Sequence, residues 1–179
     1  MFRRQRKFWG DFISETDKNL DNAFGGESRA RSKYLLYAER AEEEGLEQIA
    51  KLFRAVAKAE AIHIGNHAEA MDKVKETVNN LQDAIEGEKY ENSEMYPKFL
   101  EKAREEGEKN AARSFRWAKE VEEVHEELYK KAKKKAEEGK DMEEKKIFIC
   151  GGCGYTTMDE APDVCPVCGA PKKMFEEVE

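Results

Sequence analysis

Two copies of a Glu-x-x-His motif constrain this chain more than any other feature of its sequence. The first copy is Glu60 and His63 in the segment AEAIH, and the second is Glu122 and His125 in the segment VEEVH. In both copies the glutamate lies 15 residues after a glycine that follows a run of acidic residues. This shared spacing indicates an internal duplication of a helix pair.

Each half of the duplication carries one more glutamate ahead of its glycine, Glu27 in GES and Glu88 in GEK. Glu27 lies 18 residues before Gly45, whereas Glu88 lies 19 residues before Gly107. The extra residue falls in the helix that contains Pro97, and a proline inside a helix removes one backbone hydrogen bond. We therefore predict a kink or a bulge in that helix.

Apolar periodicity predicts an all-α bundle in residues 14–139 and a separate module of turns and short strands in 146–179, joined by a linker over 140–145. Ser14 and Asp17 have capping-box spacing, and Asn80 is the expected N-cap of the third helix. We expect four helices, which span about 14–44, 46–74, 81–106 and 108–138. Residues 1–13 are expected to form a basic and aromatic arm packed on the same protein.

Size and charge exclude several classes of function. The chain has 179 residues, which allows one ordinary domain with a small annex, and its net charge of −7 makes nucleic acid an unfavourable partner. No apolar run approaches the roughly 20 residues that cross a bilayer, and no signal peptide is recognisable. We therefore expect a cytoplasmic protein that binds no membrane and keeps its cysteines reduced.

The glutamates and histidines of both motifs fall in the register that faces the helix core. Glu60 and His63, for example, continue the apolar series Ile49, Phe53 and Val56. A half-buried salt bridge would explain one such pair but not two pairs in register with duplicated glutamates. Several unpaired carboxylates in one core would each cost several kcal/mol unless cations neutralise them. One Glu from each of two helices with Glu-x-x-His from two others is the ligand set of dinuclear carboxylate bundles, which suits Fe or Mn.

A second group of metal-binding residues lies near the end of the chain. The cysteines form two C-x-x-C pairs separated by eleven residues, Cys150, Cys153, Cys165 and Cys168. Two such pairs can place four sulfurs around one metal, and a module of this size needs a metal to fold. The spacing leaves iron and zinc both open, since structural zinc sites use the same geometry.

Nearly the whole chain resembles the rubrerythrin family. The resemblance rests on the segments GES, AEAIH, GEKYENSEMYP and EEVH, and then on CGGCGY and CPVCGAP. It implies a ferritin-like four-helix di-iron domain over residues 1–139 and a rubredoxin-like metal-ribbon domain over 146–179. The cofactors would be two Fe in the bundle and one Fe held by the four cysteines, where Zn could substitute.

The resemblance also implies which side chains act. The implied di-iron ligands and catalytic residues are Glu27, Glu60, His63, Glu88, Glu91, Glu122 and His125. In the family the residues that match His63 and Glu91 exchange as ligands of one iron with redox state. Glu91 is also the acid that the duplication does not supply, because Ala30 stands at its place in the first half.

Other polar residues near the motifs have weaker assignments. Tyr34 and Tyr96 match tyrosines that neighbour the ligands in the family, although ordinary core aromatics would fit both positions equally well. His67 lies one turn beyond His63, and we expect it to support or pack against the site rather than to bind metal. The remaining glutamates of the EVEEVHEE segment have no expected metal role: Glu120, Glu123, Glu126 and Glu127.

Membership of such a family implies reduction of hydrogen peroxide to water, with electrons relayed through the four-cysteine iron. No Gly-rich dinucleotide motif follows a strand, so an external protein is the expected electron donor, either a rubredoxin or an NAD(P)H-dependent reductase. Three other functions remain open: iron oxidation and storage, reduction of dioxygen or oxidation of an organic substrate at the same site, and a non-enzymatic module with zinc thiolates.

The short joint between the second and third helices predicts an assembly. In a ferritin-like bundle these helices run parallel, so the chain must return about 30 Å along the bundle and about 10 Å across it. The expected connector, residues 75–80, spans at most roughly 20 Å. We therefore predict a domain-swapped homodimer, in which Glu27, Glu60 and His63 of one chain join the remaining ligands of its partner.

Overall fold

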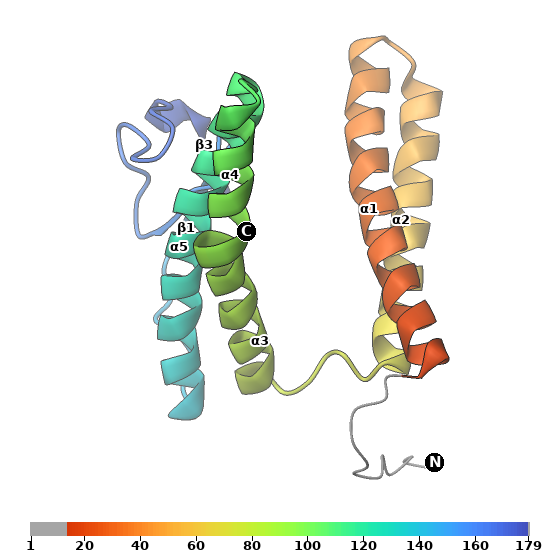
Figure 1. Cartoon of the computed structure of the whole chain (residues 1–179), viewed down its shortest axis with the longest axis horizontal. Coiled ribbons are helices and arrows are strands. Elements are labelled where there is room, and N and C mark those ends of the chain that lie inside the picture. Colours follow the sequence, from red (N-terminus) through yellow and green to blue (C-terminus); the bar gives the residue numbers. More distant parts are fainter. Residues whose placement is uncertain (1–13, 179) are drawn as a thin grey trace. The chain divides into compact units, whose positions relative to one another are not determined.

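The computed structural model describes residues 14–178, which form two compact units divided between Lys75 and Glu76 (Figure 1). The predicted N-terminal arm, residues 1–13, lies outside the described residues. Within residues 14–178 no helix combines the length and the apolar character that crossing a membrane requires. The described chain is mostly helical, with a small region of strands that contains the four cysteines.

The first unit is a hairpin of two long helices, α1 (Glu15–Glu43) and α2 (Glu47–Ala70), which lie side by side in Figure 1. The predicted capping box is confirmed, because the Ser14 hydroxyl accepts from the Asp17 N–H and the Asp17 carboxylate accepts from the Ser14 N–H. Gly45 ends α1 with φ of +75°, a conformation that glycine adopts without steric cost.

The second unit begins with another hairpin that repeats the first. Its first arm is α3 (Thr77–Tyr90), a π-helix (Glu91–Met95) and α4 (Tyr96–Glu105), and its second arm is α5 (Lys109–Glu137). Gly107 has φ of +74°, close to the value at Gly45. Both turns also contain the same backbone hydrogen bond, from Leu46 N to Ala41 O at 2.8 Å and from Glu108 N to Ala103 O at 2.8 Å. The duplicated spacing in the sequence therefore corresponds to a duplicated helix turn.

Two predicted helix boundaries are wrong. The second helix ends at Ala70 rather than near residue 74, because Asp72 has φ of +53° and the Lys73 N–H turns back to Ala68 O at 2.9 Å. The third helix begins at Thr77, and the Asn80 N–H bonds to the Glu76 carbonyl at 3.0 Å. Asn80 is therefore inside the first turn and is not the N-cap.

The predicted bulge is confirmed as the π-helix Glu91–Met95, which ends two residues before Pro97. The positions of aromatic rings show where the second hairpin contains one residue more than the first. Each hairpin contains a cluster of three rings with nearly the same centroid spacing, 5.6 to 6.4 Å, formed by Tyr34, Tyr37 and Phe53 and by Tyr96, Phe99 and Phe115. These rings are all offset by 62 positions, whereas Glu27 and Glu88 are offset by 61. The π-helix thus shifts the register of Glu88 relative to the aromatic cluster.

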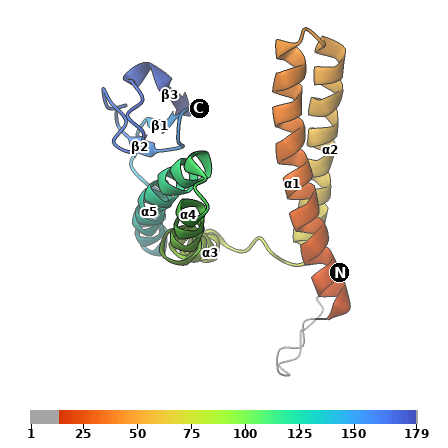
Figure 2. The same ribbon diagram turned by 45° about the horizontal axis from the view of Figure 1, so that its top comes forward.

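The C-terminal module contains a small antiparallel sheet with strand order β2-β1-β3. Figure 2 labels its three strands. Its strands are β1 (Ile147–Cys150), β2 (Thr156–Met158) and β3 (Phe175–Val178). Among the described residues, the largest side chains with less than 2% exposure are Cys150 and Cys165, both of this module. The interior of the module therefore contains two of the four cysteine side chains, together with the small side chain of Ala161.

Candidate metal centres

The first hairpin brings together one predicted set of ligands. Glu27 of α1 and Glu60 and His63 of α2 each place one donor atom within 4.8 Å of the other two. The His63 Nδ1 lies 2.9 Å from Glu60 Oε2, as the three-residue helical spacing requires. The Glu60 side chain is 13% exposed and that of His63 is 53% exposed, so this hairpin alone leaves the histidine open to solvent.

The second hairpin repeats this arrangement with Glu88 of α3 and Glu122 and His125 of α5, whose donor atoms also lie within 4.8 Å of one another. The His125 Nδ1 lies 2.8 Å from Glu122 Oε2, and both side chains are largely shielded from solvent. Each hairpin therefore presents two carboxylates and one imidazole in the same geometry. Such a triad is half of the ligand set expected for a dinuclear carboxylate site.

Electrostatics in the second triad indicate a site built for cations. Burial, the charge of Glu122 and a hydrogen bond to it raise the pKa of Glu88 to about 7. Burial and then the charge of Glu122 likewise raise the pKa of Glu91. Burial is thus the main cause of both pKa shifts, and repulsion between carboxylates that no cation neutralises adds to it.

The raised pKa of Glu88 predicts how pH affects the metal-free protein. A carboxyl group whose folded pKa lies above its unfolded value stabilises the fold at low pH, and this contribution is lost as pH rises from about 4.5 to about 7. Glu88→Gln mimics the protonated acid, so its Tm should exceed that of the wild type at pH 7.5 and approach it at pH 5. Thermal unfolding followed by circular dichroism measures both values, and equal Tm differences at the two pH values would contradict the prediction.

The other predicted site residues lie around the triads rather than within them. Glu91 begins the π-helix and is not among the three residues of the second triad. Burial and the charges of Glu91, Glu122 and Glu88 raise the pKa of Tyr96, so its phenol lies close to these acids and stays protonated. Tyr34 occupies the matching place in the aromatic cluster of the first hairpin. His67 belongs to neither triad.

The four cysteines form the third group, with all four sulfurs within 4.8 Å of one another. The Sγ atoms of Cys150 and Cys168 lie 3.7 Å apart, and those of Cys153 and Cys165 lie 3.6 Å apart. A Cβ on Gly152 would lie 3.3 Å from Cys168 Sγ, so the chain passes close to the sulfur there.

Burial and hydrogen bonding shift the pKa values of three of the four thiols. Burial raises the pKa of Cys153 and of Cys168. Burial also opposes ionisation of Cys165, but hydrogen bonds from the backbone N–H groups of Cys168 and Val167 and from the Cys153 and Cys168 thiols together outweigh burial and lower the pKa of Cys165 to about 7. In the metal-free module the Cys165 thiolate is thus favoured, whereas the thiols of Cys153 and Cys168 resist ionisation. A bound cation would stabilise the thiolate form of all four cysteines.

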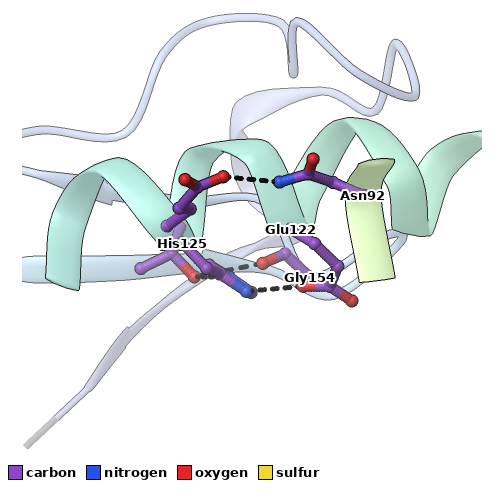
Figure 3. A network of polar contacts seen from close by, with 6 residues as sticks. Asn92, Glu122, His125 and Gly154 are labelled. Carbon is purple, nitrogen blue, oxygen red and sulfur yellow. Dashed lines mark hydrogen bonds and ion pairs between the residues drawn. The ribbon is translucent and has the colours of Figure 1, made fainter. Parts of the chain in front are cut away.

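One hydrogen bond joins the second triad to the cysteine module, and the sequence analysis missed it. The His125 Nε2 lies 3.1 Å from Thr156 Oγ1 of β2, and the Thr156 hydroxyl donates to the Gly154 carbonyl at 3.1 Å (Figure 3). The Thr156 hydroxyl, which donates to Gly154, is free to accept from Nε2–H, and a neutral His125 in that tautomer presents Nδ1 to a metal beside Glu122. His125 and Thr156 are 31 positions apart, so no local pattern reveals this contact.

A second missed contact involves Glu126, which had no expected role. Glu126 is a buried charged residue of the described chain, with 9% of its surface exposed. Glu126 Oε2 accepts from Asn92 Nδ2 at 2.8 Å (Figure 3). Lys130 Nζ lies 2.7 Å from Oε1 of the same carboxylate. Helical spacing could have found half of this contact, because Glu126 lies one turn after Glu122 and shares its face.

The donor sets fit metals of two kinds. Carboxylates and imidazoles suit Fe or Mn, and the closely spaced acids would otherwise repel one another. Four thiolates around one point suit Fe or Zn. Both sets therefore agree with the kinds of metal expected from the sequence.

Comparisons with protein families match both parts of the chain. The family described as rubrerythrin matches residues 18–133, and the rubredoxin-like domain of rubrerythrin matches residues 148–176. Among curated proteins, rubrerythrin-2 of Clostridium acetobutylicum is 40% identical over 171 residues, which cover 88% of this chain and 93% of the relative.

Nigerythrin provides a second comparison, in sequence and in structure. The nigerythrin of Nitratidesulfovibrio vulgaris is 39% identical, and the alignment covers 91% of this chain and 86% of the relative. A solved structure of nigerythrin in its fully reduced, all-ferrous state has a TM-score of 0.55 and 35% identity, and it covers 96% of this chain and 90% of that one.

Proposed function

Because the chain belongs to the rubrerythrin family of di-iron proteins, we propose that it is a non-haem di-iron peroxidase that reduces hydrogen peroxide to water. The observation that carries this proposal is the pair of matching triads, together with a four-cysteine module hydrogen-bonded to a histidine of one triad. The proposed di-iron ligands and catalytic residues are Glu27, Glu60, His63, Glu88, Glu91, Glu122 and His125.

The protein side chains hold and shield the reaction site. When bound, iron supplies the electrons that cleave the O–O bond of peroxide, which amino-acid side chains do not provide. The carboxylates neutralise the cations, and the two histidines complete the ligand set. Tyr96, with its raised pKa, keeps a phenolic proton beside Glu91 and Glu122 and can donate a hydrogen bond into the site. In the second hairpin the side chains of Glu122 and His125 are 16% and 26% exposed, so helical packing limits the access of water to them.

Stopped-flow oxidation of the fully reduced holoprotein tests the proposed reaction. We expect peroxide to oxidise the carboxylate-bound iron faster than dioxygen does, with two electrons consumed per peroxide reduced to two waters. Faster oxidation by dioxygen would favour the dioxygen-reducing alternative. Formation of a mineral core during turnover with Fe(II) would favour iron storage, and a colourless thiolate site with zinc would exclude the electron relay.

Electrons are proposed to pass through the four-cysteine iron to the second triad of the same chain. The hydrogen-bonded series from His125 through Thr156 to Gly154 supports this route, since Gly154 directly follows Cys153. The reductant would be an external protein, either a rubredoxin or an NAD(P)H-dependent reductase. The exposed Val164, which directly precedes Cys165, gives such a donor an apolar contact close to the metal.

Thr156→Val should slow this internal transfer about tenfold, because it removes the hydroxyl between His125 and the cysteine module while keeping the side-chain shape. The measurement is the reoxidation of the thiolate iron after peroxide is added, followed by its visible absorption. Thr157→Val is the matched control, since the Thr157 hydroxyl contacts only the Met158 carbonyl, at 3.5 Å, among the hydrogen bonds of residues 14–178. Equal rates in the two variants would exclude Thr156 from the route.

A domain-swapped homodimer is proposed to complete each di-iron site. Glu60 and Glu88 must meet at one site, yet Ala70 lies about 15 Å along α2 beyond Glu60, and Thr77 lies about 16 Å along α3 before Glu88. The connector between Ala70 and Thr77 spans at most about 25 Å when fully extended. Because α2 ends earlier than predicted, the connector begins closer to Glu60 along the bundle axis. Because α3 also begins earlier than predicted, the connector ends farther from Glu88, so the axial distance that it must cover is unchanged. The Lys73 ammonium also bonds to Asp21, which ties the start of the connector to the first hairpin.

Complementation between two inactive chains distinguishes swapped from unswapped dimers. Co-expression of Glu60→Ala chains with Glu122→Ala chains produces heterodimers that can be isolated with two different tags. In a swapped heterodimer one site combines the intact first triad of one chain with the intact second triad of the other, so it should bind iron. In an unswapped heterodimer every site carries one substitution. Recovery of about half the wild-type di-iron content therefore supports swapping, and no recovery refutes it.

A further inference from the structure

The contact between Glu126 and Asn92 joins α5 to the π-helix. Asn92 follows Glu91 in this segment, and its side-chain amide donates to the Glu126 carboxylate at 2.8 Å (Figure 3). Lys130 Nζ balances the charge at 2.7 Å from the other carboxylate oxygen. These groups hold the π-helix at the residue directly next to a proposed ligand.

The first hairpin serves as an internal comparison, because it lacks each part of this contact. Its helix α1 is an uninterrupted α-helix from Glu15 to Glu43, and Ala30 stands where the second hairpin has Glu91. Four residues after Glu60 the chain has Ile64, whereas four residues after Glu122 it has Glu126. The buried acid thus occurs only in the hairpin that contains the π-helix and the additional glutamate.

Energetics indicate that Glu126 does more than fill space. A buried carboxylate carries a desolvation cost that an apolar residue such as Ile64 avoids. A π-helix is also an uncommon backbone arrangement that occurs frequently at functional sites. One contact of this segment is local, since the Ser93 hydroxyl donates to the Lys89 carbonyl at 2.6 Å. The Asn92–Glu126 contact supplies support from a second helix.

We propose that the Asn92–Glu126 hydrogen bond positions Glu91 at the metal site by holding the π-helix against α5. Glu122 and Glu126 lie one turn apart on α5, so the same helix face presents a ligand and fixes the segment that carries Glu91. This role makes Glu126 and Asn92 positioning residues rather than ligands. The proposal rests on the proposed function of the triads as a di-iron site. It adds that a contact between two residues that are not ligands keeps Glu91 in place.

Amide hydrogen exchange of the metal-free full-length protein is the first test. In Asn92→Ala the amides of residues 91–96 should exchange about tenfold faster or more, because a hydrogen bond to a charged group is lost. Asn92→Asp keeps the side-chain size but places a second carboxylate against Glu126, so it should accelerate exchange at least as much. Glu127→Gln is the matched control, since Glu127 also pairs with Lys130 at 2.8 Å but is exposed. Unchanged exchange in both Asn92 variants would overturn the proposal.

Titration with Co(II) separates a positioning role from a merely structural one. Binding to carboxylate and imidazole is followed by weak d–d absorption, and binding to the cysteines by strong charge-transfer bands. We expect Asn92→Ala to weaken Co(II) binding at the carboxylate site about tenfold, with the thiolate site and the Glu127→Gln control unchanged. Faster exchange without weaker Co(II) binding would overturn the positioning role. Absence of Co(II) at the carboxylate site in the wild type would instead refute the proposed di-iron function.

Discussion

Glu122→Ala will abolish iron binding at the carboxylate–histidine site while the four-cysteine metal is retained. Glu122 lies at the centre of the second triad, 2.8 Å from His125 and close enough to raise the pKa values of Glu88 and Glu91. Removing a ligand is expected to weaken binding by more than the roughly 10- to 100-fold that is typical of changes next to ligands. Metal analysis and the visible spectrum report the two sites separately.

The same substitution should stabilise the metal-free protein near neutral pH. Without the Glu122 charge, Glu88 and Glu91 repel one neighbour fewer, so the folded state carries less unfavourable electrostatic energy. Glu123→Ala is the control, because Glu123 is adjacent and exposed and should alter neither property. Normal iron content in Glu122→Ala would contradict the proposed ligand set, whatever the change in Tm.

Cys165→Ser should have the second large effect, unfolding of the C-terminal module with loss of its metal. Cys165 is 2% exposed and lies with Cys150 in the interior of the module. Structural metals of this kind contribute about 10 kcal/mol or more to the folding of small domains, and few apolar contacts here could replace that contribution. Amide protection in β1, β2 and β3 should fall to that of an unfolded chain, while α1 and α2 keep theirs.

A control substitution within the module tests whether its unfolding results from loss of the metal. Glu176→Gln changes an exposed residue of β3 and should leave both the thiolate spectrum and the amide protection intact. A strong chelator should reproduce the unfolding in the wild type. Persistent protection of the strands in metal-free Cys165→Ser would mean that the sheet folds by itself, contrary to the prediction.

Several elements could be predicted because their causes are local. The capping box at Ser14 and the helix-ending Gly45 depend on neighbouring backbone groups, and the π-helix follows from one extra residue between repeated landmarks. The ends of the connector between α2 and α3 could not be predicted as accurately. Asn80 is a good N-cap residue, but hydrogen bonding to Glu76 extends the helix beyond it, and a propensity is too weak to oppose a formed turn.

The sequence by itself determined the duplication, the members of both triads and the four-cysteine group, since helical periodicity and motif spacing specify which side chains share a face. Only the tertiary structure decided what touches these groups from elsewhere in the chain. The contact of His125 with Thr156, and that of Glu126 with Asn92, each join segments more than 30 positions apart. Such contacts depend on how elements pack, and packing is decided by the shapes and charges of whole surfaces rather than by spacing along one helix.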